Sequence, residues 1–155
     1  MKDSQAYYRK YLSVDHGGKR IGIAVSNETA FIACPHSIIA HISREEDAKR
    51  ILEIAISEHC TDILVGVPYD SDGGIGPSAR RVLRFVDVLK TFASIPIHLW
   101  DESGSSQALE DLSIRKGESS KQRKKPSDDR VAALILQDYL EHQANLRDIN
   151  ATEQQ

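Results

Sequence analysis

The sequence predicts an α/β fold built on a five-stranded mixed sheet, with the first three strands antiparallel, later strands parallel, and helices on both faces. Three short extended runs come first, and later apolar runs alternate with segments of helical period, which gives the order βββαβαβα. The chain has 155 residues, about the size of one domain. It is 40% hydrophobic and 28% charged, as in an ordinary globular domain.

The first two expected strands are Tyr11 to Val14 and Ile21 to Ser26, joined by a glycine-bearing connection typical of a hairpin. A third extended run, Phe31 to Ile42, contains Pro35. Proline lacks a backbone donor, so it suits an edge strand or a strand entry better than a central strand.

Helices and strands then alternate. Ser43 and Glu46 have the spacing of a capping box, and apolar residues recur after them at helical period. Residues 63–67 form a continuous apolar run, typical of a strand covered on both faces. Pro77 fits the first turn of a second helix, and residues 97–100 form the fifth expected strand.

The last third of the chain ends in a long helix. A short helix is expected over about residues 105–117, and the polar segment 118–127 is expected to be mobile. A final helix follows to about Gln143. Residues 144–155 are polar and are expected to fray, so the predicted organisation is one domain over residues 1–143 with a C-terminal tail.

Charge, cysteine and histidine content exclude several classes of protein. The net charge of −3 excludes a uniformly basic nucleic-acid-binding protein, so a polyanion would have to bind a local basic patch.

Cys34 and Cys60 lie far apart without zinc-ligand spacing, and are expected to be free buried thiols in a reducing compartment, with a disulfide as the alternative. The six histidines are scattered and predict no zinc site. No apolar run has the length of a signal peptide or a membrane span, and we expect a cytoplasmic protein.

Two acidic positions follow strands. Period-two alternation places Asp15 on the face of the first strand opposite Leu12 and Val14, although a simple turn aspartate explains it as well. Asp101 and Glu102 stand where the fifth strand ends, and ligands of open α/β sheets bind beyond the carboxyl ends of strands. A solvated loop pair is the alternative for these two acids.

A third acidic position, Asp129, extends the apolar stripe of the last helix, so its side chain should point toward the sheet. The stripe continues through Ala132, Ala133, Leu136 and Leu140. Asp128 fills the ordinary role of an acid in a first helical turn. Hard divalent cations prefer carboxylate oxygens, and two of them about 4 Å apart catalyse phosphodiester hydrolysis. The residues alone therefore indicate a candidate acidic metal site.

Four motifs occur in order along the chain. Residues 15–26 carry an aspartate and two glycines before Lys-Arg-Ile-Gly-Ile-Ala; residues 66–77 carry Gly-Val-Pro, Asp-Gly and Gly-Pro. Residues 100–102 are Trp-Asp-Glu, and residues 129–137 begin the last helix with an acid before its apolar stripe. Together these motifs resemble those of the YqgF (RuvX-like) family, over about residues 12–140.

This resemblance implies an RNase H-like fold related to Holliday-junction resolvases, and a metal-dependent nuclease that processes the 5′ end of pre-16S rRNA. Asp15, Glu102 and Asp129 match the family's catalytic acids and would be the ligands of Mg²⁺ or Mn²⁺. Structured RNA or branched DNA would be the substrate, and a homodimer would resemble the resolvases. The family usually has an arginine where this chain has Ser103. The alternatives are a resolvase-like DNA nuclease and a ribosome-assembly protein that binds nucleic acid with a weak catalytic site.

Basic residues are expected to bind the nucleic-acid backbone, with a solvated surface as the alternative. The expected contacts are Lys19, Arg20, Lys121, Arg123, Lys124 and Lys125. Arg80 and Arg81 either extend this patch or form the exposed face of a helix. Two other classes are excluded: an esterase, because the chain has no GxSxG motif, and a two-domain ATPase with a similar Asp-x-Gly-Gly opening, because the chain supplies one domain.

Overall fold

The computed structural model describes residues 8–102 and 127–154, and its elements follow the predicted order βββαβαβα. They are β1 (Tyr11–His16), β2 (Arg20–Ser26), β3 (Ala33–Ala40), α1 (Arg44–Ser57), β4 (Asp62–Val67), α2 (Pro77–Phe92), β5 (Ile97–Asp101) and α4 (Asp128–Glu153).

The strands form one mixed sheet in the order β3-β2-β1-β4-β5. The pairs β1–β2 and β2–β3 are antiparallel, whereas β1–β4 and β4–β5 are parallel, as predicted. Pro35 lies in β3, which is an edge strand, and it pairs with Ala24 directly after an irregularity in the β2–β3 register. The edge position predicted from this proline is confirmed. Strands β1, β4 and β5 run in the same direction, so their carboxyl ends lie at the same end of the sheet.

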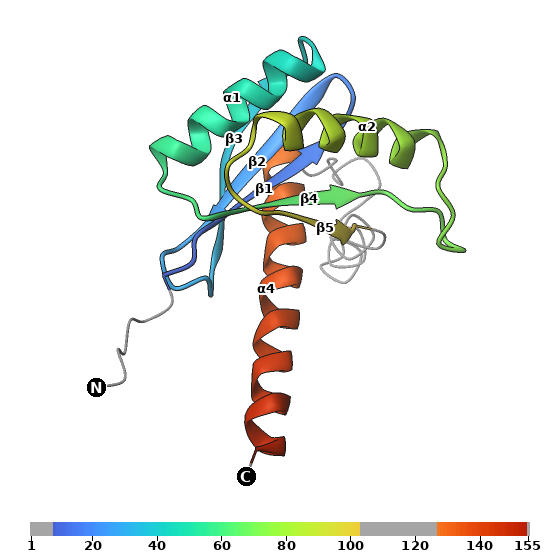
Figure 1. The fold of residues 1–155 in the computed structure, drawn as a ribbon. Coiled ribbons are helices and arrows are strands. Elements are labelled where there is room, and N and C mark those ends of the chain that lie inside the picture. Colours follow the sequence, from blue (N-terminus) through green and yellow to red (C-terminus); the bar gives the residue numbers. More distant parts are fainter. Residues whose placement is uncertain (1–7, 103–126, 155) are drawn as a thin grey trace, which may run out of the picture.

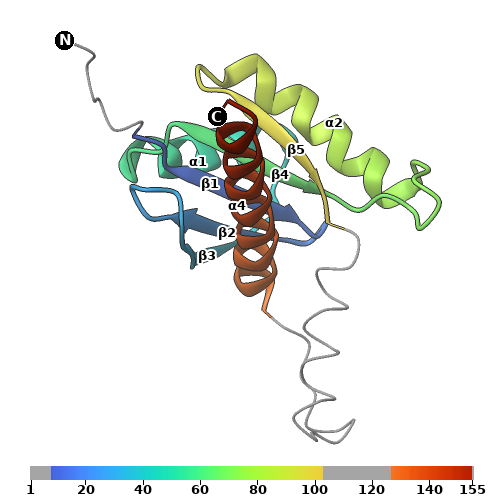
Figure 2. The same ribbon diagram turned by 90° about the horizontal axis from the view of Figure 1, so that it is seen from below.

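Helices cover both faces of the sheet (Figure 1). Helices α1 and α2 pack on one face, where Ile51 and Phe85 are buried with Leu12 and Val14 of β1. Helix α4 crosses the other face (Figure 2), where Ser13 donates a hydrogen bond of 2.8 Å to the Ala132 carbonyl. The alternation of β1 therefore divides its side chains between two cores, and Asp15 belongs to the α4 side.

The starts of α1 and α2 are as predicted, whereas Ser127 at the start of α4 makes no side-chain cap hydrogen bond. The Ser43 side chain accepts a hydrogen bond of 3.1 Å from the Glu46 amide at the start of α1. Pro77 occupies the first turn of α2. A cap of the Ser43 type contributes about 1 kcal/mol, and it places the first turn of α1 beside the end of β3.

Two expectations are wrong in part. Helix α4 continues to Glu153 instead of ending near Gln143, because residues 144–153 contain no proline or glycine to stop it. Its buried residues end at Leu140, and the remainder projects from the sheet (Figure 1). Both cysteines are free as expected, but only Cys60 is buried; Cys34 is exposed because it lies on the edge strand.

The expected short helix over residues 105–117 lies outside the described residues. Among the helices in the described ranges, none is both long and apolar enough to cross a membrane.

Candidate active site

Asp15 lies near the carboxyl end of β1, half-buried on the α4 face of the sheet. A glycine stands beside it on each neighbouring strand. Gly22 of β2 is its partner in the antiparallel ladder. On the other side Val14 pairs with Val65, so Gly66 of β4 is the next residue along. The sheet therefore has no side chain directly to either side of the Asp15 carboxyl group.

Gly22 lets the first turn of α4 rest on the sheet. A Cβ atom at Gly22 would lie 1.9 Å from the carbonyl oxygen of Asp128, far inside any real contact. Only a residue without a side chain fits there. The helix N-terminus is thereby held against β2 beside Asp15, with the positive end of its dipole at the acidic site.

Gly66 makes room for Glu102. A Cβ atom at Gly66 would lie 2.8 Å from Oε2 of Glu102. The Glu102 amide donates a hydrogen bond of 3.1 Å to the Val67 carbonyl, which continues the β4–β5 pairing by one residue. The Glu102 carboxyl group extends back over Gly66 and shares a hydrogen bond with the Asp15 carboxyl group. Its Oε2 atom is buried and has no hydrogen-bond partner among the described residues.

The two carboxyl groups oppose each other's ionisation. Burial, followed by the charge of Asp15 and the hydrogen bond with it, raises the pKa of Glu102 to about 8. Burial also raises the pKa of Asp15, and the charge of Asp128 adds to the rise, while the hydrogen bond from Glu102 and the charge of Arg81 lower it. A bound divalent cation would offset this repulsion and favour both carboxylates.

Helix α4 brings its two tandem acids to the same end of the sheet. Asp128 is the one whose charge acts on Asp15, and its Oδ2 pairs with Nε of Arg20 at 3.1 Å. Asp129 is half-buried, and its Oδ1 accepts a hydrogen bond of 3.0 Å from the Arg130 amide. The stripe that Asp129 begins is buried as predicted, through Ala132, Ala133, Leu136 and Leu140. The structure thus brings Asp15 and Glu102 together, with both acids of α4 at the adjacent helix start.

Arg81 is the basic residue whose charge acts on both acids, and the sequence left its role open. Its charge lowers the pKa of Asp15 and of Glu102. Its guanidinium group lies over Gly18, where a Cβ atom would be 3.2 Å from Cζ of Arg81, and it donates a long hydrogen bond of 3.5 Å to the His16 carbonyl. Arg80 is exposed whereas Arg81 is half-buried. One signal in the sequence could have singled out Arg81. It directly precedes Val82, which belongs to the buried stripe of α2, and α2 follows the end of a strand.

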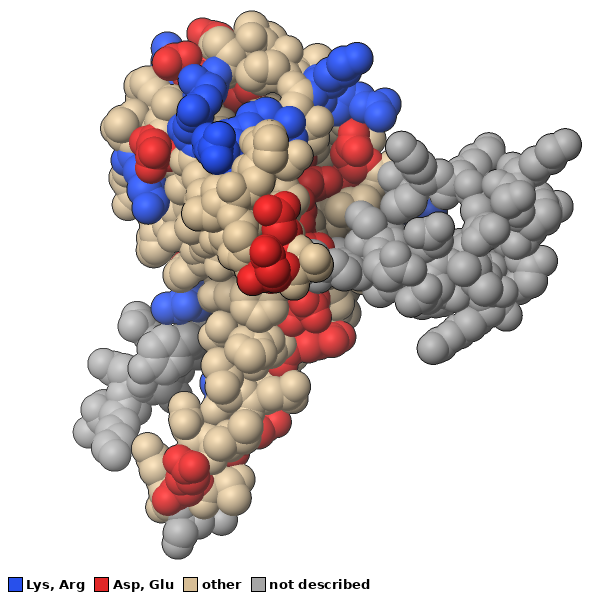
Figure 3. Space-filling view, turned by 90° about the vertical axis from the view of Figure 1, so that its right-hand side faces the viewer, with Lys and Arg blue, Asp and Glu red and all other residues tan. Residues whose placement is uncertain are grey.

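A pocket of about 620 Å³ opens beside the acids. Its lining is Gly17, Gly18, Lys19, Arg20, Arg81 and Asp128. Figure 3 looks onto the edge where β1, β4 and β5 end, with Lys and Arg over the upper part of this face and a stripe of Asp and Glu below. Three cations in one pocket suit a phosphate group. Lys19 and Arg20, predicted as contacts, line this pocket; Lys121, Arg123, Lys124 and Lys125 lie outside the described residues.

A mixed sheet in this order with helices on both faces defines an RNase H-like fold, the fold of a class of nucleases that hydrolyse phosphodiester bonds. The family of "RuvX: Holliday junction resolvase" matches residues 9–142, and the chain belongs to that family.

Relatives support the same assignment. The chain is 37% identical over 137 residues to a protein of Thermoanaerobacter pseudethanolicus named "Putative pre-16S rRNA nuclease", covering 88% of this chain and 99% of the relative. It is 36% identical over 134 residues to a protein of the same name from Roseiflexus sp., covering 86% and 95%.

Solved structures agree on the fold. T. thermophilus RuvC in complex with a Holliday junction substrate superposes with a TM-score of 0.54 at 17% identity, over 87% of this chain and 96% of that one. The Fowlpox virus resolvase in complex with Holliday junction DNA gives a TM-score of 0.52 at 11% identity, over 86% and 97%.

Proposed function

We propose that this protein is a divalent-metal-dependent nuclease that processes the 5′ end of pre-16S rRNA in the cytoplasm. The observation that carries the proposal is the Asp15–Glu102 carboxyl pair at the strand ends, next to a pocket lined by three cations. The pair supplies oxygen ligands for a metal, and the pocket supplies positive charge for the phosphate backbone.

The acidic residues fit a hard divalent cation such as Mg²⁺ or Mn²⁺. Carboxylate oxygens are the ligands these ions prefer. Oε2 of Glu102 is buried without a partner, and both carboxyl groups have raised pKa values that a cation would reverse. Asp15, Glu102 and Asp129 would hold the metal, with Asp128 as the other candidate on α4. When bound, the metal activates water and stabilises the leaving oxygen.

The remaining residues bind and orient the substrate. Lys19, Arg20 and Arg81 hold a phosphate group in the pocket, and the guanidinium groups of the two arginines suit its oxygens. Gly17 and Gly18 line the same pocket, and the missing side chain at Gly18 leaves room for the Arg81 guanidinium group. Because Asp15 is on a central strand, between two packed layers, its carboxyl group keeps a defined position while the strand of RNA or DNA is bound.

The substrate class is taken from the sequence relatives. Those at 36–37% identity are named for pre-16S rRNA. The structural neighbours bound to junction DNA are below 20% identical and support the fold alone. Branched DNA is the second candidate, favoured by the description of the matching family. A binding protein with a weak site is the third, favoured by Ser103 at the family's arginine position. A homodimer stays a prediction.

The test is cleavage of a pre-16S rRNA fragment with its 5′ leader, followed on gels with Mg²⁺ or Mn²⁺. Wild type is expected to cleave it, and Asp15→Asn to lose at least about 100-fold, since loss of even an outer-shell partner costs about 10–100-fold in metal sites. Asp87→Asn, an exposed acid on α2, is the matched control and should cleave normally. Asp128→Asn and Asp129→Asn, assayed together, identify the acid of α4 that the reaction needs.

Three outcomes contradict the proposal. Equal cleavage by wild type and Asp15→Asn would exclude the acidic site. Cleavage of a four-way DNA junction in place of the RNA would exclude the substrate. If wild type binds the RNA tightly but does not cleave it with Mg²⁺ or Mn²⁺, the protein is a nucleic-acid-binding assembly protein and not a nuclease.

A further inference from the structure

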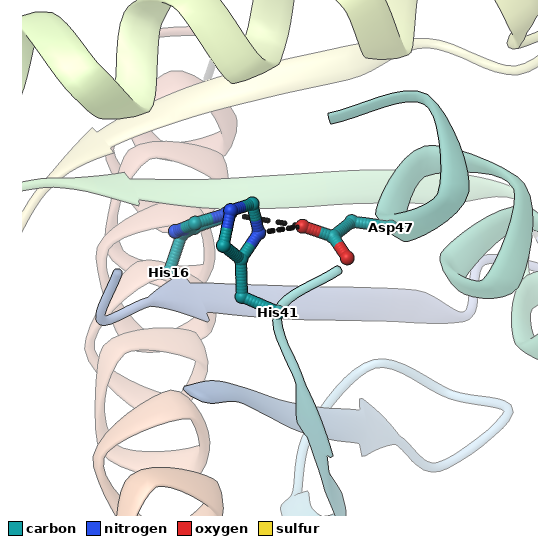
Figure 4. A group of neighbouring side chains, drawn as sticks. All are labelled: His16, His41 and Asp47. Atoms are coloured by element: carbon teal, nitrogen blue, oxygen red, sulfur yellow. Dashed lines mark hydrogen bonds and ion pairs between the residues drawn. The ribbon is translucent and has the colours of Figure 1, made fainter. Parts of the chain in front are cut away.

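His16, His41 and Asp47 converge on the face of the sheet opposite the acidic site (Figure 4). His16 ends β1, His41 directly follows β3, and Asp47 lies in the first turn of α1. One ligand atom from each residue can be chosen so that all three lie within 4.8 Å of one another. Two of the histidines that are scattered along the sequence are therefore neighbours in space.

The Asp47 carboxylate is held in place through Oδ1, the oxygen that does not contact the histidines. Its side chain is fully buried. Oδ1 accepts hydrogen bonds from the Ile42 amide at 3.0 Å and from the Arg50 guanidinium at 2.7 Å. Oδ2 accepts a hydrogen bond from Nδ1 of His41 and lies 3.5 Å from Nε2 of His16. Outer-shell donors of this kind hold a carboxylate ligand in the orientation that a metal needs.

His16 presents a weakly bonded ring nitrogen, Nε2, to the same point. Its side chain is 2% exposed and packs against the Phe85 ring at a centroid distance of 4.9 Å. Among the described residues, its buried Nε2 atom makes no hydrogen bond shorter than its 3.5 Å contact with Oδ2 of Asp47. A buried nitrogen with so long a contact is poorly satisfied, and a bound ion would satisfy it.

Space for a ligand adjoins the cluster. A pocket of about 340 Å³ is lined by both imidazoles, with Ser43, Arg44, Glu45, Arg81 and Phe85 around it. Three protein ligands leave one position of a tetrahedral metal open, and a ligand in this pocket would reach both imidazoles.

We propose that His16, His41 and Asp47 form a binding site for a dication of the zinc class, separate from the acidic site. Two imidazole nitrogens and one carboxylate oxygen are a typical zinc donor set. Bond lengths of about 2.0–2.2 Å place tetrahedral ligand atoms about 3.3–3.6 Å apart. The His16 Nε2–Asp47 Oδ2 distance of 3.5 Å agrees, whereas the hydrogen-bonded atoms His41 Nδ1 and Asp47 Oδ2 would have to move apart to admit the ion. The metal would join the end of β1, the start of α1 and the connection after β3.

Binding has three identifiable costs. The hydrogen bond from Nδ1 of His41 to Oδ2 of Asp47 is lost when both atoms bind the metal. Nδ1 of His16 accepts a long hydrogen bond of 3.3 Å from the Gly18 amide, and coordination through Nε2 moves the ring proton to Nδ1, so this bond is lost. The charge of Arg81 also acts on His16 and opposes a cation.

The experiment is calorimetric titration of the whole chain with Zn²⁺, in wild type and in an Asp15→Asn background that weakens the acidic site. We expect one zinc ion per chain in that background. His41→Ala, which removes the most exposed of the three ligands, should weaken its binding at least tenfold. His36→Ala is the matched control, because His36 pairs with Glu58 at 3.1 Å and belongs to no group of three possible metal ligands among the described residues. Circular dichroism checks that each variant is folded.

Cobalt gives an independent readout, since Co²⁺ in a tetrahedral nitrogen–oxygen site absorbs in the visible range. The absorption should appear in the Asp15→Asn background and disappear with His41→Ala. The proposal is overturned if zinc does not bind, if binding vanishes with Asp15→Asn while the protein stays folded, or if His41→Ala binds zinc as tightly as its parent. Each of these results would leave the cluster as a hydrogen-bond network.

Discussion

Replacing Gly22 by alanine would force the start of α4 away from the sheet beside Asp15. The new Cβ atom would lie 1.9 Å from the Asp128 carbonyl oxygen and 2.9 Å from the Asp129 amide nitrogen, both backbone atoms. Ordinary contact begins at 3.4 Å, so the helix start has to move by about 1.5 Å. Overpacking of this kind costs about 3 kcal/mol, and for a chain of this length the melting temperature should fall by about 6–12 °C.

Gly66→Ala is the matched comparison on the other side of Asp15. Its Cβ atom would lie 2.8 Å from Oε2 of Glu102 and 3.0 Å from Cδ1 of Ile135, which are ends of side chains that can turn aside. We expect a stability loss of only about 1 kcal/mol but a large loss of metal-dependent cleavage, because the Glu102 carboxyl group is displaced.

The assays for this pair are thermal unfolding by circular dichroism and cleavage of the RNA precursor. If the melting temperature of Gly22→Ala lies within a degree of that of wild type, α4 does not pack closely on β2 at Gly22. If Gly66→Ala retains full cleavage, the position of Glu102 over Gly66 does not matter to the reaction.

Three further predictions concern charge and exposure. Arg81→Ala should weaken RNA binding and lower the slope of log K against log salt by about 1, whereas the exposed Arg84→Ala on the same helix should not; equal slopes would exclude the phosphate contact. The raised pKa of Glu102, about 8 against 4.5, means that the folded state holds the proton longer, so the stability of metal-free protein falls as pH rises from about 4.5 to about 8. Glu102→Gln should lack this part of the fall in urea unfolding, and parallel pH curves would contradict it. Burial raises the pKa of Cys60 to about 11, so iodoacetamide at pH 8 should label the exposed Cys34 alone until denaturant is added; two native adducts by mass spectrometry would contradict this.

Strand faces, helix starts and the edge strand were predictable from the sequence, because each depends on residues within one short segment. The alternation of β1 places Asp15 on the face opposite Val14. The Ser43 cap depends only on a residue three positions further along the chain. The edge position of Pro35 follows from its missing backbone donor. The end of α4 was not predictable in this way. A polar segment without proline or glycine continues a helix that is already formed, so composition alone did not distinguish it from a frayed tail.

The role of Arg81 was open for a different reason. Arg80 and Arg81 are adjacent and equally basic, and the angle at which α2 packs on the sheet decides which one faces the acids. The same holds for the tandem acids of α4, where the contact of the helix start with Gly22 sets the place of Asp128.

By itself, the sequence determined the order of the strands and helices, the faces of β1 and the acids at strand ends, because backbone geometry links each of these to a period of two or 3.6 residues within one segment. The tertiary structure decided which distant groups meet. Parallel pairing of β1 with β4 and of β4 with β5 brings Glu102 to Asp15, and the packing of α1 brings Asp47 to His16 and His41. Such distances depend on strand order and helix docking, which are properties of the whole core and leave no periodic trace in any single segment.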